Sequence, residues 1–172
     1  MDCEEAEAAV NRTLAEAFRA AGCGVAYALR TQRNLRIQCA VAAGVLALAL
    51  VVDASAMEVA LLAVACGLVL SLELVNTAVE VLVDGLWPQP SEVARRVKDT
   101  SAAAVVLGAA AAAAAGAVVL GPPLLARLGV PATWVKPTVA AVGAVAAAGA
   151  AAWRTLRRPS GPVEKASGPV LK

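Results

Sequence analysis

Long apolar segments alternate with short polar connections along this chain. Three of them cover about residues 35–52, 57–86 and 102–120, and a weaker one covers about 137–153. A helix needs roughly 20 consecutive apolar residues to cross a bilayer. The pattern therefore predicts an all-α integral membrane protein with three core transmembrane helices and a fourth near the C-terminus.

The connections carry residues that begin or end helices. Ser55 stands where an N-cap is expected, and Pro88 and Pro90 follow the second span. Ser91 can cap a short amphipathic stretch before the third span, and Gly121-Pro122-Pro123 is expected to end that span.

Charged and polar residues are more frequent at both ends of the chain than in the apolar segments. Residues 5–30 place small and apolar side chains at helical spacing opposite charged ones, which predicts an amphipathic helix on the membrane surface. We expect a membrane domain at 1–125, an extra transmembrane helix within 126–155, and a disordered basic tail at 156–172.

Basic residues indicate the orientation in the membrane. Of 15 Lys and Arg, 13 fall on one side if there are four spans. Because cytoplasmic loops are enriched in Lys and Arg, both termini and the 87–101 loop are predicted to lie in the cytoplasm.

Composition excludes several classes of function. The chain is 60% hydrophobic, which a soluble domain could not cover, and its net charge of +2 gives no reason to expect nucleic acid as a partner. The chain contains no His, so His bases, His metal ligands and Ser-His pairs are excluded. The four Cys have no CxxC spacing, and the two in or beside predicted spans suit small apolar positions.

A polar stripe interrupts the second apolar segment, in "LELVNTAVEVLVDGL". At about 100° per residue, its four polar residues point within roughly 80° of one another along about 16 Å of helix. A charged group deep in lipid costs at least ~2.5 kcal/mol, so intramembrane acids are usually functional. A solvated helix end explains Asp84 but not Glu73, about three turns further in. The stripe consists of Glu73, Asn76, Glu80 and Asp84.

Carboxylates beside an Asn suit two tasks, binding a divalent cation and accepting a proton from a hydroxyl. In the following connection, Arg95 and Lys98 supply positive charge of the kind that phosphates need, and Asp99 adds an acid. Basic residues there also serve as topology determinants. The chain has no GxxxxGK[ST] loop, so helices alone would have to hold a nucleotide.

Three blocks of this sequence resemble the small prokaryotic diacylglycerol kinase and undecaprenol kinase family of integral membrane lipid kinases. They are "FRAAGCGVAYALRTQRNLRIQ", "LELVNTAVEVLVD" and "VKDTSAAAVVL". The second is similar to the family signature E-x-x-N-[ST]-A-[IV]-E-x-x-[VL]-D, and the third to its K-D motif. The resemblance covers about residues 14–120.

The resemblance implies phosphorylation of a membrane lipid alcohol, with ATP as donor and Mg²⁺ as metal, at the cytoplasmic face of the bacterial inner membrane. It also implies a homotrimer with sites between subunits. Glu73 would be the general base, Asn76 would orient the hydroxyl or the γ-phosphate, and Glu80 would bind the metal. Lys98 and Arg95 would bind ATP, and Asp84 and Asp99 would support the nucleotide.

Two positions depart from the family pattern. Gln32 stands where the family usually has a metal-ligating Glu, and Gln38 replaces a frequent His. An amide oxygen can still bind Mg²⁺, so Gln32 is expected to be a second, weaker metal ligand.

Three functions remain open from the sequence. The motifs favour undecaprenol as the substrate, with diacylglycerol, which would yield phosphatidic acid, as the alternative. A non-catalytic membrane scaffold or transporter subunit could also use a polar stripe to pack helices. Simple packing would not require Lys98 and Asp99 together with the acids of the stripe.

Overall fold

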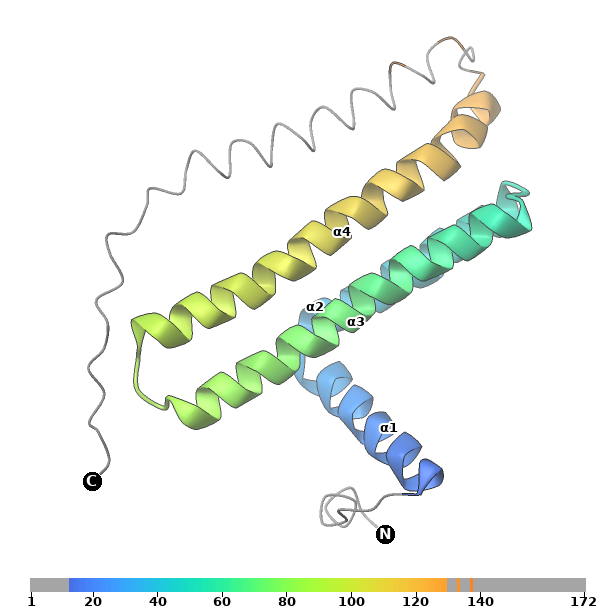
Figure 1. Cartoon of the computed structure of the whole chain (residues 1–172). Coiled ribbons are helices and arrows are strands. Elements are labelled where there is room, and N and C mark those ends of the chain that lie inside the picture. Colours follow the sequence, from blue (N-terminus) through green and yellow to red (C-terminus); the bar gives the residue numbers. More distant parts are fainter. Residues whose placement is uncertain (1–12, 130–132, 134–136, 138–172) are drawn as a thin grey trace, which may run out of the picture.

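The computed structural model of the chain describes residues 13–129 together with Thr133 and Pro137. Its regular elements are four helices in the order α1 (Leu14–Thr31), α2 (Arg33–Val51), α3 (Ala56–Leu86) and α4 (Glu92–Arg127), without strands in this part of the chain (Figure 1). Helices α2, α3 and α4 are long and apolar enough to cross a membrane. The predicted all-α class and the three core spans are therefore confirmed.

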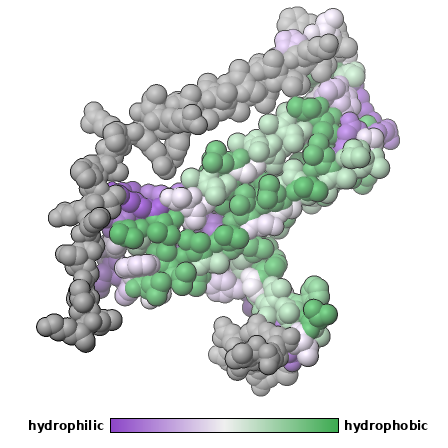
Figure 2. Space-filling model, viewed as in Figure 1, coloured by the Kyte–Doolittle hydropathy of each residue, from purple (hydrophilic) through white to green (hydrophobic). Residues whose placement is uncertain are grey.

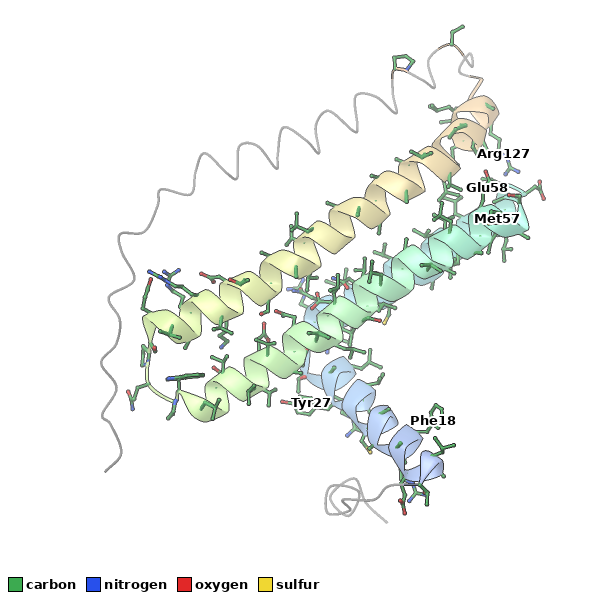
Figure 3. The ribbon with its side chains drawn as sticks, in the orientation of Figure 1. Phe18, Tyr27, Met57, Glu58 and Arg127 are labelled. Atoms are coloured by element: carbon green, nitrogen blue, oxygen red, sulfur yellow. The ribbon has the colours of Figure 1, made fainter. Side chains whose placement is uncertain are left out.

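Two predicted segments are not tested. Apart from Pro137, the fourth span at 137–153 lies outside the described residues, and so does the tail at 156–172. Helix α1 occupies most of the predicted amphipathic segment and exposes large apolar side chains, including Phe18 at 78% and Tyr27 at 51% (Figure 3). Its location on a membrane surface stays a prediction.

Helices α1 and α2 meet at a bend of one residue, Gln32. Its backbone is extended (φ −99°, ψ 112°), so it ends α1 and begins α2 at once. The Arg36 Nη1 atom donates to the carbonyls of Leu29 (2.9 Å) and Arg30 (3.2 Å). These bonds satisfy acceptors left open where α1 ends and hold the bend in place.

A tight turn joins α2 to α3. Asp53 has a positive φ of 57°, a conformation that Asp tolerates better than most residues. Ser55 caps α3 in a reciprocal capping box with Glu58, which confirms the predicted cap. Helix α3 then runs unbroken for 31 residues, about 46 Å at 1.5 Å per residue, and is longer than the ~30 Å hydrocarbon core.

Helix α4 corrects two predictions. The stretch after Ser91 is not separate from the third span, and Gly121-Pro122-Pro123 does not end it, because the helix continues to Arg127. The φ angle that proline fixes is compatible with a helix. The main loss at each proline is the hydrogen bond to the carbonyl of the residue four positions earlier. Membrane helices tolerate this loss where neighbouring groups compensate. Here Leu124, beyond both prolines, packs against a buried apolar cluster that includes Leu62 and Leu120.

Helix α3 is the centre of the fold, because α4 runs antiparallel along one side of it and α2 packs beside it (Figure 1). Gly108 lets α4 approach α3 closely, since the Leu72 side chain of α3 fills the space where a Cβ of residue 108 would lie. Apolar residues cover most of the visible helix surface, and hydrophilic residues gather at the two ends of the α3–α4 pair (Figure 2). This pattern fits a protein whose solvent is lipid.

Candidate functional site

The deep part of the polar stripe is buried among the helices. Glu73, Asn76 and Thr77 are 4%, 8% and 4% exposed, whereas the Asp84 side chain is 66% exposed. Thr77 bonds its hydroxyl to the Glu73 carbonyl one turn earlier (2.9 Å). The stripe thus passes from a buried end to an open end along α3, and each of its three carboxylates has a different partner.

Glu73 is held by Gln38 of α2. The Gln38 Nε2 atom donates to Glu73 Oε1 at 2.8 Å. Only this amide orientation is favourable, because the opposite one would set two oxygens against each other. One carboxylate oxygen is therefore engaged, and no Lys or Arg among the described residues forms an ion pair with Glu73.

Glu80 is held by two amides. Gln32 Nε2 donates to its Oε2 atom at 3.1 Å, and Asn76 Nδ2 donates to its Oε1 atom at 2.9 Å. The bend between α1 and α2 is what brings Gln32 to α3, 48 positions away in the sequence. Within the described chain, Glu80 also has no cationic partner, so neutral donors hold both carboxylates and leave their negative charge uncompensated.

The open end of the stripe carries a salt bridge. Lys98 Nζ of α4 lies 2.7 Å from Asp84 Oδ1, with the two side chains 36% and 66% exposed. The chain reverses between α3 and α4 (Figure 1), and the ion pair joins the two helices across this connection. The positive charge of Lys98 is thus fixed beyond the shallow end of the acidic stripe.

The remaining predicted residues form a separate network on α4. Arg95 bonds to Glu92 and to Asp99, each at 2.9 Å, and these side chains are more than half exposed. Among residues 13–129, neither Arg95 nor Asp99 contacts the α3 carboxylates through a hydrogen bond or an ion pair. The structure therefore joins Gln32, Asn76 and Glu80, joins Asp84 to Lys98, and leaves Arg95 and Asp99 apart.

Sequence reasoning gave Gln38 no role, although it contacts the most buried acid. The available signal was an amide inside an otherwise apolar span. Two buried acceptors near the acids, Gln38 Oε1 and Asn76 Oδ1, have no hydrogen-bond partner among the described residues. Buried acceptors without partners are rare and often mark a place where water, an ion or a ligand binds.

The acidic cluster fits an open magnesium site better than a closed one. In the described part of the chain, no three Asp, Glu, Cys or His side chains gather to hold a metal. Mg²⁺ commonly keeps several waters and binds one or two carboxylates together with substrate phosphates. Glu80, with the unpartnered Asn76 Oδ1 beside it and the amide of Gln32, supplies oxygens of that kind.

Comparison with known proteins points to one family. The family model for prokaryotic diacylglycerol kinase matches residues 19–120, which include the whole polar stripe, Gln32, Gln38 and Lys98. A diacylglycerol kinase of Synechocystis sp. is 44% identical over 112 residues, which are 64% of this chain and 64% of that protein. The undecaprenol kinase of Bacillus subtilis is 33% identical over 102 residues, which are 59% of this chain and 82% of that protein. The match thus spans less than two thirds of the Synechocystis protein.

Proposed function

The chain belongs to the prokaryotic diacylglycerol kinase family, and we propose that it transfers the γ-phosphoryl group of ATP to the hydroxyl of a membrane lipid. One observation carries the proposal. The stripe on α3 begins at the buried carboxylate of Glu73 and ends at the exposed Asp84, which pairs with Lys98 of α4, so lipid and nucleotide can approach it from opposite ends.

Glu73 is the general base in this mechanism. Its Oε1 atom is held by Gln38, which leaves Oε2 to accept the proton of the lipid hydroxyl. The hydroxyl oxygen then forms a bond to the γ-phosphorus, the bond between that phosphorus and the β,γ-bridging oxygen breaks, and ADP leaves with the electron pair. Burial of Glu73 excludes water, which would otherwise compete as acceptor.

Glu80, Asn76 and Gln32 form the proposed phosphate and metal end of the site. Glu80 and Gln32 would hold Mg²⁺, and Asn76 would orient the lipid hydroxyl or the γ-phosphate. When bound, the metal neutralises charge on the transferring phosphoryl group. The uncompensated charge of Glu73 and Glu80 favours binding of a divalent cation here.

In this proposal Lys98 contacts the phosphates of ATP, and the ion pair with Asp84 holds its ammonium group in position. Arg95 and Asp99 support the nucleotide at the exposed start of α4. Positioning and charge neutralisation supply most of the rate enhancement in phosphoryl transfer, which agrees with a site built from few reactive groups.

We infer that the site faces the cytoplasm of a bacterial inner-membrane protein, because ATP is available there and the basic residues favour that orientation. We further propose a homotrimer with sites between subunits. The preferred substrate is undecaprenol, on the likeness of "LELVNTAVE" and "ALRTQRNLRI". Diacylglycerol is the second candidate, since the Synechocystis relative bears that name at 44% identity.

The decisive experiment supplies the full chain in detergent micelles with radiolabelled ATP, Mg²⁺ and either undecaprenol or dioleoylglycerol. Formation of either phosphorylated lipid supports the proposal, and the ratio of rates identifies the substrate. Folded protein that phosphorylates neither lipid points instead to a scaffold or transporter subunit. Glu73→Gln keeps the size of the side chain and should lower kcat by at least about 100-fold, with the oligomer unchanged.

A further inference from the structure

Arg36 of α2 reaches back across the bend to the end of α1. Its Nη1 atom donates to the carbonyls of Leu29 (2.9 Å) and Arg30 (3.2 Å), while the backbone N–H of Gln32 donates to the carbonyl of Ala28 at 2.8 Å. A positive group at the C-terminal end of a helix also interacts favourably with the helix dipole. The last turn of α1 is therefore held largely by one side chain that belongs to the next helix.

The charge of Arg36 has no acidic partner in the described part of the chain. Residues 17–52 contain no Asp or Glu, and the ion pairs found among the described residues all involve cations of α4. Both hydrogen bonds of the Arg36 guanidinium go to backbone carbonyls of α1. Its structural effect is thus concentrated at the bend.

The bend determines where the Gln32 side chain points. Gln32 is the single residue between α1 and α2, and its side chain does not cap α2. Its Nε2 atom instead donates to Glu80 Oε2 of α3 at 3.1 Å. Because the backbone of Gln32 links two rigid helices, a change in the angle between them moves this amide relative to Glu80. Residues that orient the ligands of a metal often change its affinity about 10- to 100-fold when they are lost.

We propose that Arg36 is a positioning residue for the metal end of the site. By holding the last turn of α1, it fixes the backbone of Gln32 and so directs the Gln32 amide to Glu80. The inference rests on the proposed function for the role of Gln32 toward the metal, whereas the link from Arg36 to Gln32 is a structural one. The same link makes the orientation of α1 a determinant of the site.

The glutamines of the chain provide a readout that needs no kinase activity. They are Gln32, Gln38 and Gln89, so labelling the full chain with ¹⁵N-glutamine gives three side-chain amides to follow by NMR in micelles. The signal that is lost in Gln32→Glu is assigned to Gln32. In Arg36→Met this signal should shift toward that of the exposed Gln89. The Gln38 signal should stay in place, because its amide bonds to Glu73 and not across the bend.

Two further variants control for charge and for the donor. Arg33→Met removes the same charge from an exposed side chain that takes no part in the hydrogen bonds and ion pairs of the described residues. It should leave the three amide signals unchanged. Arg36→Lys keeps a cationic donor but lacks the planar fork of the guanidinium, so the Gln32 signal should shift less than in Arg36→Met.

The functional readout is a magnesium titration of lipid phosphorylation. In Arg36→Met the Mg²⁺ concentration for half-maximal activity should rise about tenfold, while the KM for lipid changes little. Gln32→Ala should raise it by a similar factor. The double variant should show no larger rise than either single variant, because both substitutions act through the same contact.

The outcomes separate this proposal from the kinase function. An unchanged Gln32 signal in Arg36→Met overturns it, whether or not the chain phosphorylates lipid. A joint shift of the Gln32 and Gln38 signals also overturns it, because Arg36 would then support helix packing in general. A shift of Gln32 alone, in a chain that phosphorylates no lipid, supports the positioning role and counts against the kinase. If Arg36→Met does not fold, Arg36→Lys decides: a shift of the Gln32 signal alone supports the proposal, and an unchanged signal overturns it.

Discussion

Gln38 and Glu73 join the first span to the second at the most buried acid among the described residues, with Gln38 Nε2 at 2.8 Å from Glu73 Oε1. The Gln38 amide fixes the rotamer of the Glu73 carboxylate. Because the amide is neutral, the carboxylate keeps its negative charge. Small displacements of a reacting group can lower a rate about 100-fold. The activity of Glu73 should therefore depend on Gln38.

We expect Gln38→Met, which keeps the length of the side chain but lacks the donor, to lower kcat about 10- to 100-fold. The KM for ATP should stay near the wild-type value, because the hydrogen bond of Gln38 goes to Glu73 and not to the Asp84–Lys98 pair. Steady-state kinetics at varied ATP measure both. Gln38→His retains an N–H donor and should recover much of the loss. Wild-type kcat in Gln38→Met would show that the hydrogen bond is not needed.

A second expectation concerns the metal. Gln32→Glu adds a carboxylate next to Glu80, where the amide now donates at 3.1 Å. Because Mg²⁺ prefers carboxylate oxygens, the Mg²⁺ concentration for half-maximal activity should fall about tenfold, equivalent to ~1.4 kcal/mol. The measurement is a magnesium titration of lipid phosphorylation. Thr31→Glu adds the same charge at an exposed neighbouring position and should leave the titration unchanged. Equal midpoints in wild type and Gln32→Glu would exclude Gln32 from the metal site.

Lys98 should govern nucleotide binding. Lys98→Met removes its charge and leaves Asp84 unpaired beside the phosphates, so the KM for ATP should rise at least about tenfold, as loss of a charged hydrogen bond of ~1.5–3 kcal/mol implies. The KM for lipid should change much less. The control is Arg96→Gln, because Arg96 bonds to Glu92 on the exposed side of α4. Comparable effects of the two substitutions would indicate general surface charge and not a contact at Lys98.

Arg127 should act on stability and not on catalysis. Its Nη2 atom donates to the Val51 carbonyl at 2.6 Å and lies 3.6 Å from Asp53, so it ties the end of α4 to the α2–α3 turn (Figure 3). Arg127→Met should lower the free energy of unfolding by about 1–2 kcal/mol, since an orphaned helix carbonyl and a charged bond are lost. Thermal unfolding in detergent measures this, and Arg127→Lys should retain part of the stability. An unchanged Tm in Arg127→Met would mean that apolar packing alone holds this end.

Local patterns were enough to predict much of the fold. Ser55 was predicted to cap α3, and this succeeded because a cap depends only on neighbouring residues; the structure adds Glu58 as its reciprocal partner. The length and composition of the apolar segments likewise predicted three spans, since lipid requires helices of that kind. The end of α4 was predicted wrongly from Pro122 and Pro123, because the packing that offsets the lost hydrogen bonds comes from residues far away in the sequence.

By itself, the sequence determined that the acids of α3 form one stripe, because their spacing along a regular helix sets their direction. The tertiary structure alone decided which group from another helix or bend holds each acid: Gln38 for Glu73, Gln32 for Glu80, and Lys98 for Asp84. It also separated Arg95 and Asp99 from the stripe. The reason is physical: helical periodicity is a property of one segment, whereas partners on other helices depend on the bend at Gln32 and on how the helices rotate and pack against one another.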